Sequence, residues 1–341
     1  MYIIEHVRNG QEILDLGTHL AMQVYALEHI HLDEGIVFPY RPSASVQIGR
    51  YQNTIEEINA PYIEEAGIQV VRRDTGGGAI YMDRNHVNFV FILNESEPKF
   101  EDNFNKIYAP AIQGLQKLGA SNVERSGRND LEIDGQKVSG AALTVTKGRL
   151  YGGYSLLLDI DFDATEQALR PSQKKIESKG IKSVRRRVTP IRPHLGEEYQ
   201  DITPEAFEKR MLLEICGVEH EEELKYYRLS DEEWAAIDQI VADKYGNWEW
   251  NYGTSPRYAL NHEGRFAGGT LSVSLAVNKG VIEDIRIYGD FFGTRPIGEL
   301  EEVLVGTRMD KPALMKALAE VDLTAYLGSI TAEELVELIL E

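Results

Sequence analysis

Arg72-Arg73-Asp74-Thr75-Gly76-Gly77-Gly78-Ala79-Ile80-Tyr81 is the stretch of sequence that decides the fold. The preceding residues 68–72 are typical of a strand, and the residues after the three glycines are typical of another. Glycine lets the backbone adopt positive φ and bring several N–H groups against an anion or a flat base, while the two arginines supply positive charge. The stretch therefore favours a nucleotide or phosphate cradle, with a flexible hairpin loop as the alternative.

Other common catalytic motifs are missing from the sequence. The triple glycine lacks the Gly-Lys-Ser/Thr of a P-loop, and its spacing and missing helix exclude a dinucleotide fingerprint. The eight histidines are scattered and form no zinc motif, so no resident metal site is expected. Gly152-Gly153-Tyr154-Ser155 is not a hydrolase elbow, and Cys216 lies in an apolar helical segment, which favours a core residue over a nucleophile.

A second candidate site surrounds a predicted hairpin. Gly127-Arg128-Asn129-Asp130 precedes the turn Asp134-Gly135, and Lys137-Val138-Ser139-Gly140-Ala141-Ala142 follows on the returning strand. Alternation along a strand predicts that Lys137 and Ser139 share a face. A lysine beside small residues can hold a phosphate or carboxylate as a point charge, and the alternative is a solvent-exposed hairpin lysine.

Composition limits the class of protein. The chain has 341 residues with 43% hydrophobic and 27% charged residues, which predicts two folded domains rather than disorder. A net charge of −19 disfavours general nucleic-acid binding. One cysteine, no apolar stretch long enough to cross a bilayer and no apolar signal region in residues 1–10 predict a cytoplasmic protein.

The charge is uneven along the chain. Residues 174–192 contain eight lysines and arginines against Glu177 alone. In an acidic protein this basic segment favours a phosphate-bearing ligand or an acidic protein surface, and a solvated loop is the alternative. We also expect residues 174–187 to order over a bound intermediate and exclude water.

Hydrophobic periodicity predicts an α+β architecture. Helices are expected at residues 16–32, 103–118 and across the acidic region 203–245. Antiparallel strands are expected at residues 87–93, 131–146 and 151–160. Strands at 268–277 and 281–288, followed by helices, form a second unit. We place the boundary near residue 247, which gives domains 1–247 and 248–341.

Four ordered blocks of the chain resemble the lipoate-protein ligase A family. The blocks are residues 72–81, residues 127–142, residues 179–188, and the C-terminal stretches Trp250-Asn251-Tyr252-Gly253 and Asp290-Phe291-Phe292-Gly293. The resemblance implies the biotin/lipoate-ligase fold, a mixed sheet with flanking helices related to class II aminoacyl-tRNA synthetases, plus a small α+β accessory domain. It covers nearly the whole chain.

The resemblance also implies the reaction. Lipoate and ATP, with Mg²⁺, would give lipoyl-adenylate, which would acylate a lysine on the lipoyl domain of a 2-oxoacid dehydrogenase E2 subunit or on a glycine-cleavage H or H-like protein. Lys137 would act as an electrostatic clamp rather than a nucleophile. The implied binding residues are Arg73, Gly76, Gly77, Gly78, Ala79, Ile80, Tyr81, Asn129, Asp130, Lys137, Ser139, Gly140, Ser183 and Val184.

The chain departs from the family pattern at two places. Met82 stands where the family usually has histidine, and Gly152-Gly153-Tyr154-Ser155 replaces a His-His-Gly-Thr type run. Both changes are expected near the acyl pocket, where they bear on the choice between lipoate and octanoate and on the acceptor. The alternatives are an octanoyl transferase of the same fold, a biotin ligase, and a non-catalytic lipoyl-adenylate-binding protein.

Overall fold

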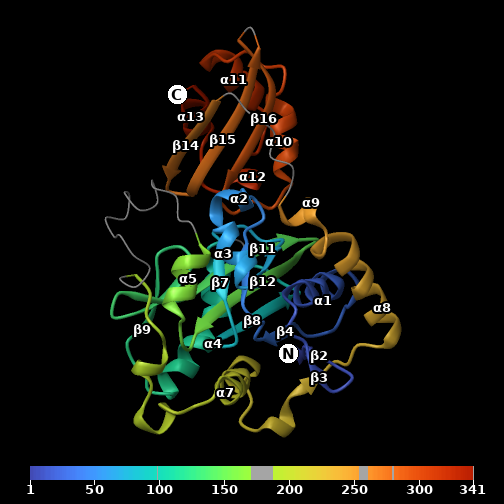
Figure 1. Ribbon diagram of the computed structural model, residues 1–341, viewed down its shortest axis with the longest axis vertical. Helices are drawn as coiled ribbons and strands as arrows, with labels where there is room; N and C mark the ends of the chain where they lie inside the picture. Colours follow the sequence, from blue (N-terminus) through green and yellow to red (C-terminus); the bar gives the residue numbers. More distant parts are fainter. Residues whose placement is uncertain (98, 170–186, 253–259, 279, 341) are drawn as a thin grey trace.

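The computed structural model describes residues 1–97, 99–169, 187–252, 260–278 and 280–340. A larger body contains the N-terminus, and a smaller unit of residues 260–340 stands on it at the top of Figure 1. Sheets and helices occur in both parts, which confirms the α+β class expected from the sequence.

An eight-stranded mixed sheet forms the centre of the larger body. Its strands, in spatial order, are β13 (Lys225–Tyr226), β1 (Tyr2–Ile3), β4 (Ile36–Tyr40), β8 (His86–Leu93), β12 (Arg149–Leu157), β11 (Gln136–Thr146), β10 (Asp130–Ile133) and β9 (Val123–Ser126). β1 pairs in parallel with β13 and β4, and the pairs from β4 to β9 are antiparallel. The predicted Asp134-Gly135 hairpin joins β10 to β11, with positive φ at both turn residues.

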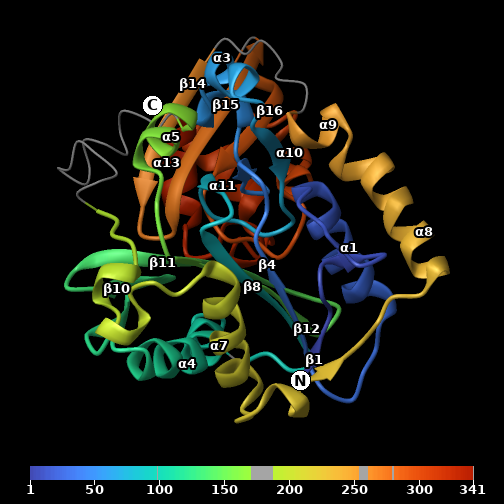
Figure 2. The ribbon, with the colours of Figure 1, turned by 60° about the horizontal axis from the view of Figure 1, so that its bottom comes forward.

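Helices α4 (Asp102–Lys117) and α7 (Pro204–Cys216) cover one face of this sheet (Figure 2). The apolar side chains of α4 recur at helical spacing and pack with Phe89 and Phe91 of β8 in the largest hydrophobic cluster. Cys216, the last residue of α7, packs at the edge of this cluster, and burial raises the pKa of its thiol. This placement agrees with the predicted core role.

The other face of the sheet is covered by helix α1 (Leu16–His29) and a second sheet. Asp15 caps α1 by accepting a hydrogen bond from the backbone N–H of Thr18 at 2.6 Å. The second sheet contains β6 (Gln69–Arg72), β5 (Ser45–Ile48) and β7 (Ile80–Met82), in that order. Alternate residues of β8, such as Val90, face this side. The two sheets therefore enclose the space in which the candidate site lies.

The smaller unit has a three-stranded antiparallel sheet backed by helices. Its elements are β14 (Leu260–Phe266), β15 (Gly269–Asn278), β16 (Val281–Gly289), α10 (Ile297–Leu304), α11 (Lys311–Leu318), α12 (Thr324–Leu327) and α13 (Ala332–Leu340). β14 and α10 were not expected from the sequence, because β14 alternates only weakly in burial and no capping side chain marks the start of α10.

The remaining elements connect these layers. They are β2 (Val7–Arg8), β3 (Gln11–Glu12), α2 (Thr54–Glu57), α3 (Ala60–Glu65), α5 (Phe162–Ala168), α8 (Asp231–Ile240), the π-helical turn η5 (Val241–Tyr245), α9 (Trp248–Asn251) and three short 3-10 helices at 192–194, 197–199 and 221–223. α9 packs on β6 of the larger body, although α9 comes after residue 247 in the sequence. The domain boundary near residue 247 stays a prediction. In the part of the chain that is described, no helix is long and apolar enough to span a bilayer.

Candidate active site

The triple glycine forms the turn between β6 and β7, and the guanidinium of Arg73 fixes its shape. Arg73 donates hydrogen bonds to the carbonyl oxygens of Gly76 at 2.7 Å and Gly78 at 3.0 Å, and to Oγ1 of Thr75 at 3.1 Å. Burial lowers the pKa of Arg73 to about 10, so the side chain stays cationic at neutral pH. The turn is therefore held from within by a buried positive charge.

The three glycines meet different surroundings. Gly77 has φ of +95°, a conformation that favours glycine, and Gly77 and Gly78 both line a cavity of about 770 Å³. Gly76 does not line that cavity. A Cβ atom at Gly76 would lie 2.2 Å from the carbonyl oxygen of Phe291 in the smaller unit. Close approach of the two backbones is therefore the structural reason for glycine at position 76.

Arg72 makes different contacts from Arg73. The expectation that both arginines present charge to a ligand is wrong for Arg72. Its guanidinium donates to the carbonyl oxygens of Gly49 at 2.9 Å and Gln52 at 2.7 Å, to Trp250 O at 2.9 Å and to Oγ1 of Thr54 at 2.7 Å. Arg72 is buried and does not line the cavity. It ties β6 to the loop at residues 49–52, to the start of α2 and to α9.

Lys137 lines the same cavity as the glycine turn. Its ammonium lies 2.7 Å from Oδ1 of Asp130, and a Cβ atom on Gly140 would lie 2.7 Å from Nζ. The lysine side chain thus passes over Gly140. Its backbone is paired with residues 187–189, because Lys137 N donates to Arg187 O at 2.8 Å and Thr189 N donates to Lys137 O at 3.0 Å.

A β-bulge decides which residues accompany Lys137. The register between β10 and β11 shifts at Leu131/Glu132, so that Val138 and Ser139 both turn toward α4 and α7. Ser139 is fully buried there, with its Oγ 3.2 Å from the hydroxyl of Tyr108. The prediction that Lys137 and Ser139 share a face is therefore wrong. The extra residue in the bulged strand puts Gly140 beside Lys137 instead.

The cavity lies between the two sheets of the larger body. Its floor follows the register of the eight-stranded sheet, in which Asn88 pairs with Ser155 and Ser155 with Gly140. The next row is Val90, Gly153 and Ala142, so small residues line this part of the floor. The predicted binding residues that line the cavity are Arg73, Gly77, Gly78, Ala79, Ile80, Tyr81, Asn129, Asp130, Lys137 and Gly140.

Of the two departures from the family pattern, one lines this cavity and the other does not. Gly152-Gly153-Tyr154-Ser155 lines it, as expected. Met82 is buried in the hydrophobic cluster that contains Tyr151 and is not part of the lining. Predicted residues Ser183 and Val184, and most of the basic segment, lie outside the described residues. Arg192, at the end of this segment, donates two hydrogen bonds from Nε and one from Nη2 to the carboxylate of Asp159, which is a structural contact.

Several cavity-lining side chains were not found from the sequence. Gln23 of α1 accepts a hydrogen bond from the hydroxyl of Tyr151 at 3.2 Å at the end of the cavity remote from Lys137. In the sequence, Gln23 could have been recognised as a polar residue between Leu20 and Leu27 on the apolar face of this helix. His86 and Asn88 could likewise have been recognised, because they are polar residues at alternate positions of the otherwise apolar strand β8.

The smaller unit closes the glycine-turn end of the cavity. Asp290 and Arg265 line it. Phe292 packs in the main hydrophobic cluster of the larger body, and the guanidinium of Arg128 lies 4.5 Å above its ring. Arg128 also donates to the carbonyl oxygens of Gly268 and Asp290. Arg128 of the second candidate motif is thus a contact between the two units.

Two family models together match most of the chain. The family described as "Lipoyl protein ligase A/B catalytic domain" matches residues 15–216, and "Bacterial lipoate protein ligase C-terminus" matches residues 255–339. A lipoate–protein ligase of Streptococcus pyogenes is 52% identical over 339 residues, which cover 99% of each chain.

Solved structures share the fold. The crystal structure of P. falciparum LipL1 in complex with lipoate has a TM-score of 0.80 at 20% identity and covers 99% of both chains. A lipoate-protein ligase A bound with ATP has a TM-score of 0.59 at 20% identity and covers 74% of this chain and 98% of its own. These matches confirm the fold and family expected from the four motifs. The chain belongs to the lipoate-protein ligase family.

Proposed function

We propose that the protein attaches lipoate to a lysine of an acceptor domain in two steps, through lipoyl-adenylate made from ATP. The observation that carries the proposal is that Lys137 and the Gly77–Gly78 turn line one cavity. In the first step, a carboxylate oxygen of lipoate attacks the α-phosphorus of ATP and pyrophosphate leaves. In the second step, a lysine amine attacks the acyl carbon and AMP leaves.

The cavity has the length that an acyl substrate requires. Lys137 Nζ lies over Gly140, which pairs with Ser155 of β12. Tyr151 is four residues from Ser155 on the same strand, a distance along the strand of about 14 Å. A chain of eight carbons joined by bonds of about 1.5 Å is about 9 Å long when extended. An ion-pair contact to Lys137 adds about 3 Å. We therefore place the carboxyl end of lipoate at Lys137, the alkyl chain over Gly153 and Ala142, and the ring toward Tyr151.

The charges at the glycine-turn end suit the adenylate. Negative charge builds on the α-phosphate in the first step and on the acyl oxygen in the second, and both are within the range of one ammonium at Lys137. A donor that is held in place by Asp130 costs little reorganisation, and one such donor is worth about 3 kcal/mol. Lys137 is thus proposed as a clamp for both steps.

Mg²⁺ is proposed to enter with the nucleotide. In the described ranges, no three metal-ligating side chains are grouped. The carboxylates that line the cavity are those of Glu57, Asp130, Glu132 and Asp290, and Asp130 is paired with Lys137. A magnesium ion held mainly by phosphate oxygens and water would fit this donor set, and it would neutralise charge on the leaving pyrophosphate.

The acceptor is proposed to be the lipoyl domain of a 2-oxoacid dehydrogenase E2 subunit or a glycine-cleavage H or H-like protein. Candidate domains incubated with ATP, Mg²⁺ and lipoate should gain the mass of one lipoyl group on one lysine, as read by mass spectrometry. Peptide mapping would identify the lysine. Mass gain with biotin in place of lipoate would refute the assignment of the acyl substrate.

Isotope exchange between pyrophosphate and ATP tests the first step. We expect lipoate-dependent exchange in the wild type, and a loss of about 100-fold in Lys137→Ala, since the clamp is worth about 3 kcal/mol. Lys147→Ala is the matched control, because Lys147 is exposed and pairs only with Glu28 among the described residues. Exchange that survives in Lys137→Ala would contradict the proposed clamp.

A further inference from the structure

His86 lies on the cavity floor with its ring held by a carboxylate. It is the first residue of β8, pairs with Leu157 of β12 and is 3% exposed. Nδ1 of its imidazole lies 3.0 Å from Oδ1 of Asp83 on the preceding turn, and the backbone N–H of Asp83 is also directed at Nδ1, at 3.1 Å. Nε2 is the ring nitrogen that points away from this turn. Among the described residues that line the cavity, His86 is the one histidine.

The sheet register fixes how far His86 lies from Lys137: His86 pairs with Leu157 of β12, and Gly140, which underlies the lysine ammonium, pairs with Ser155, two residues away on the same strand. β12 is the strand between β8 and β11, so two strand spacings of about 4.8 Å and an offset of two residues of about 3.3 Å put the backbones of His86 and Gly140 about 12 Å apart. His86 and Gly140, which underlies the lysine ammonium, face the same side of the sheet. A carbonyl group between β8 and β11 is therefore within reach of both side chains.

Chemistry supplies the reason for a second group at this position. A lysine amine has an ordinary pKa near 10.4, so nearly all of it carries a proton at pH 7 and cannot attack. Imidazole is the side chain that ordinarily changes charge between pH 5 and 8. Two carboxylates that line the cavity already have partners: Asp130 is paired with Lys137, and Asp290 accepts a hydrogen bond from Thr270 N at 2.5 Å.

We propose that His86 accepts the proton of the attacking lysine in the second step, with Asp83 as its positioning residue. This inference rests on the proposed function. The amine nitrogen forms a bond to the acyl carbon, the bond from that carbon to the phosphate oxygen breaks, and AMP leaves. The proton from the nitrogen passes to Nε2 of His86, and Asp83 stabilises the resulting imidazolium through Nδ1–H.

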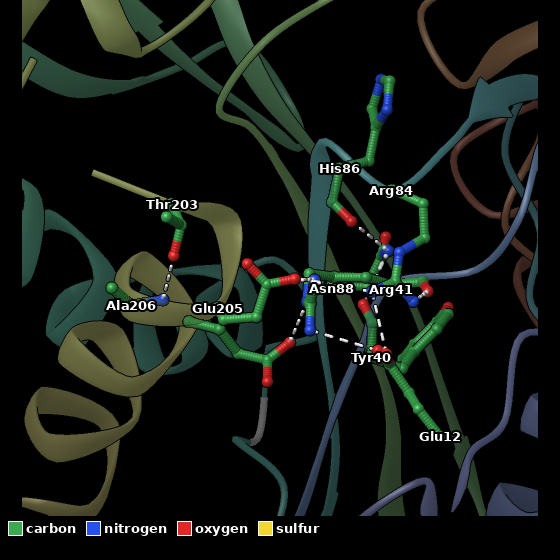
Figure 3. Close-up of polar contacts among 10 residues, drawn as sticks. Glu12, Tyr40, Arg41, Arg84, His86, Asn88, Thr203, Glu205 and Ala206 are labelled. Atoms are coloured by element: carbon green, nitrogen blue, oxygen red, sulfur yellow. Dashed lines mark hydrogen bonds and ion pairs between the residues drawn. The ribbon is translucent and has the colours of Figure 1, made fainter. Parts of the chain in front are cut away.

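The surroundings of His86 are compatible with this role. The charged and titratable side chains that contact the imidazole are Asp83 on the same turn and Tyr81 on β7, and Asp161 at the start of α5 acts on Tyr81. Arg84 turns toward Glu12 at 2.8 Å and Glu205 at 3.5 Å, and Figure 3 shows the imidazole directed away from that ion-pair cluster. Tyr81 contributes a ring edge at 6.3 Å.

Single-turnover transfer from purified lipoyl-adenylate tests the inference. The acceptor is the domain that the wild type modifies in the mass-spectrometric test, and hydroxylamine serves as a second nucleophile that is unprotonated at neutral pH. In His86→Gln, we expect transfer to lysine to fall about 100-fold at pH 7, with hydroxylamine trapping unchanged. The ratio of the two rates within one sample is independent of the folded fraction.

The pH dependence separates a proton acceptor from a merely structural residue. In His86→Gln only amine that is already neutral reacts, so its rate should rise about tenfold per pH unit below the pKa of lysine and the deficit should narrow. Asp83→Asn should show a smaller deficit in the same direction. His29→Gln, at an exposed site on α1, is the control that should match the wild type.

Three results would overturn the inference. Lysine transfer by His86→Gln within about threefold of the wild type at pH 7 would show that no proton acceptor was lost. Equal losses with lysine and hydroxylamine would show a structural defect. Pyrophosphate exchange is measured in parallel and reports the first step alone. A wild type without lipoate-dependent exchange would refute the proposed function and this inference together. Normal exchange, combined with either near-normal lysine transfer or equal losses with the two nucleophiles, would refute only the inference.

Discussion

Replacing Gly140 by alanine would displace the ammonium of Lys137 without disturbing the core. The added Cβ would lie 2.7 Å from Nζ and 3.0 Å from Cε, whereas ordinary contact begins at 3.4 Å. The ammonium must therefore move by about 0.7 Å, and a displacement of about 1 Å at a reacting centre can cost about 100-fold in rate. Because the clash falls on the far end of a flexible side chain, the free energy of unfolding should change by less than about 1 kcal/mol.

Lipoate-dependent pyrophosphate exchange and urea unfolding, measured on the same preparation, provide the assay. We expect Gly140→Ala to lose about 100-fold in exchange while its unfolding midpoint stays near that of the wild type. Gly298→Ala is the control, because Gly298 lies in α10 of the smaller unit and its added Cβ would meet only Glu301 at 3.9 Å. A folded Gly140→Ala protein with wild-type exchange would show that the position of the Lys137 ammonium does not limit the reaction.

Three further substitutions test other parts of the structure. Arg72→Ala leaves several buried carbonyl groups without a donor and should lower the free energy of unfolding by roughly 3 to 5 kcal/mol, as measured by urea unfolding. Cys216→Ser should leave lipoyl transfer unchanged, since Cys216 is not a cavity residue; loss of transfer would favour a thioester mechanism. Burial lowers the pKa of His6 and of His19, the latter to about 3, so the unfolded chain takes up protons that the folded chain does not as the pH falls below about 6.5. Stability should be full above that pH and fall by about 1.4 kcal/mol per unit for each histidine below it, and His6→Phe should roughly halve the slope; an unchanged slope in urea unfolding between pH 6.5 and 5 would contradict this.

Local patterns were sufficient for most of the fold. The alternation of β8, the Asp134-Gly135 turn and the helical spacing of α4 are each determined by residues within one element and its ends. Such elements could therefore be placed within a few residues of their observed bounds. β14 was missed because its residues 260–266 carry Asn, His, Glu, Gly and Arg, and only pairing with β15 makes this segment a strand.

The candidate site was predictable where backbone chemistry dictates the residue. Gly77 is required by the positive φ of the turn, and Lys137 by charge, so both could be identified from residue type and spacing. Ser139 could not be placed correctly, because a bulge depends on the pairing of two strands and leaves no reliable mark on one of them. Gly76 was assigned to the ligand although its small size is required by the backbone of Phe291, more than 200 residues away.

The pair Arg72-Arg73 shows why adjacent residues of one motif need separate explanations. On a strand, consecutive side chains point to opposite sides, so a pair of arginines cannot both face one ligand. Arg72 ends β6 on the side of the loops at 49–52 and of Trp250, while Arg73 turns back under Gly76 and Gly78. Loss of Arg72 should therefore act first on stability, and loss of Arg73 on the shape of the turn that lines the cavity. The loops held by Arg72 include Tyr51, whose ring stacks on Phe291 at 4.8 Å. One arginine thus shapes the glycine turn, and its neighbour holds the loop on which the smaller unit rests.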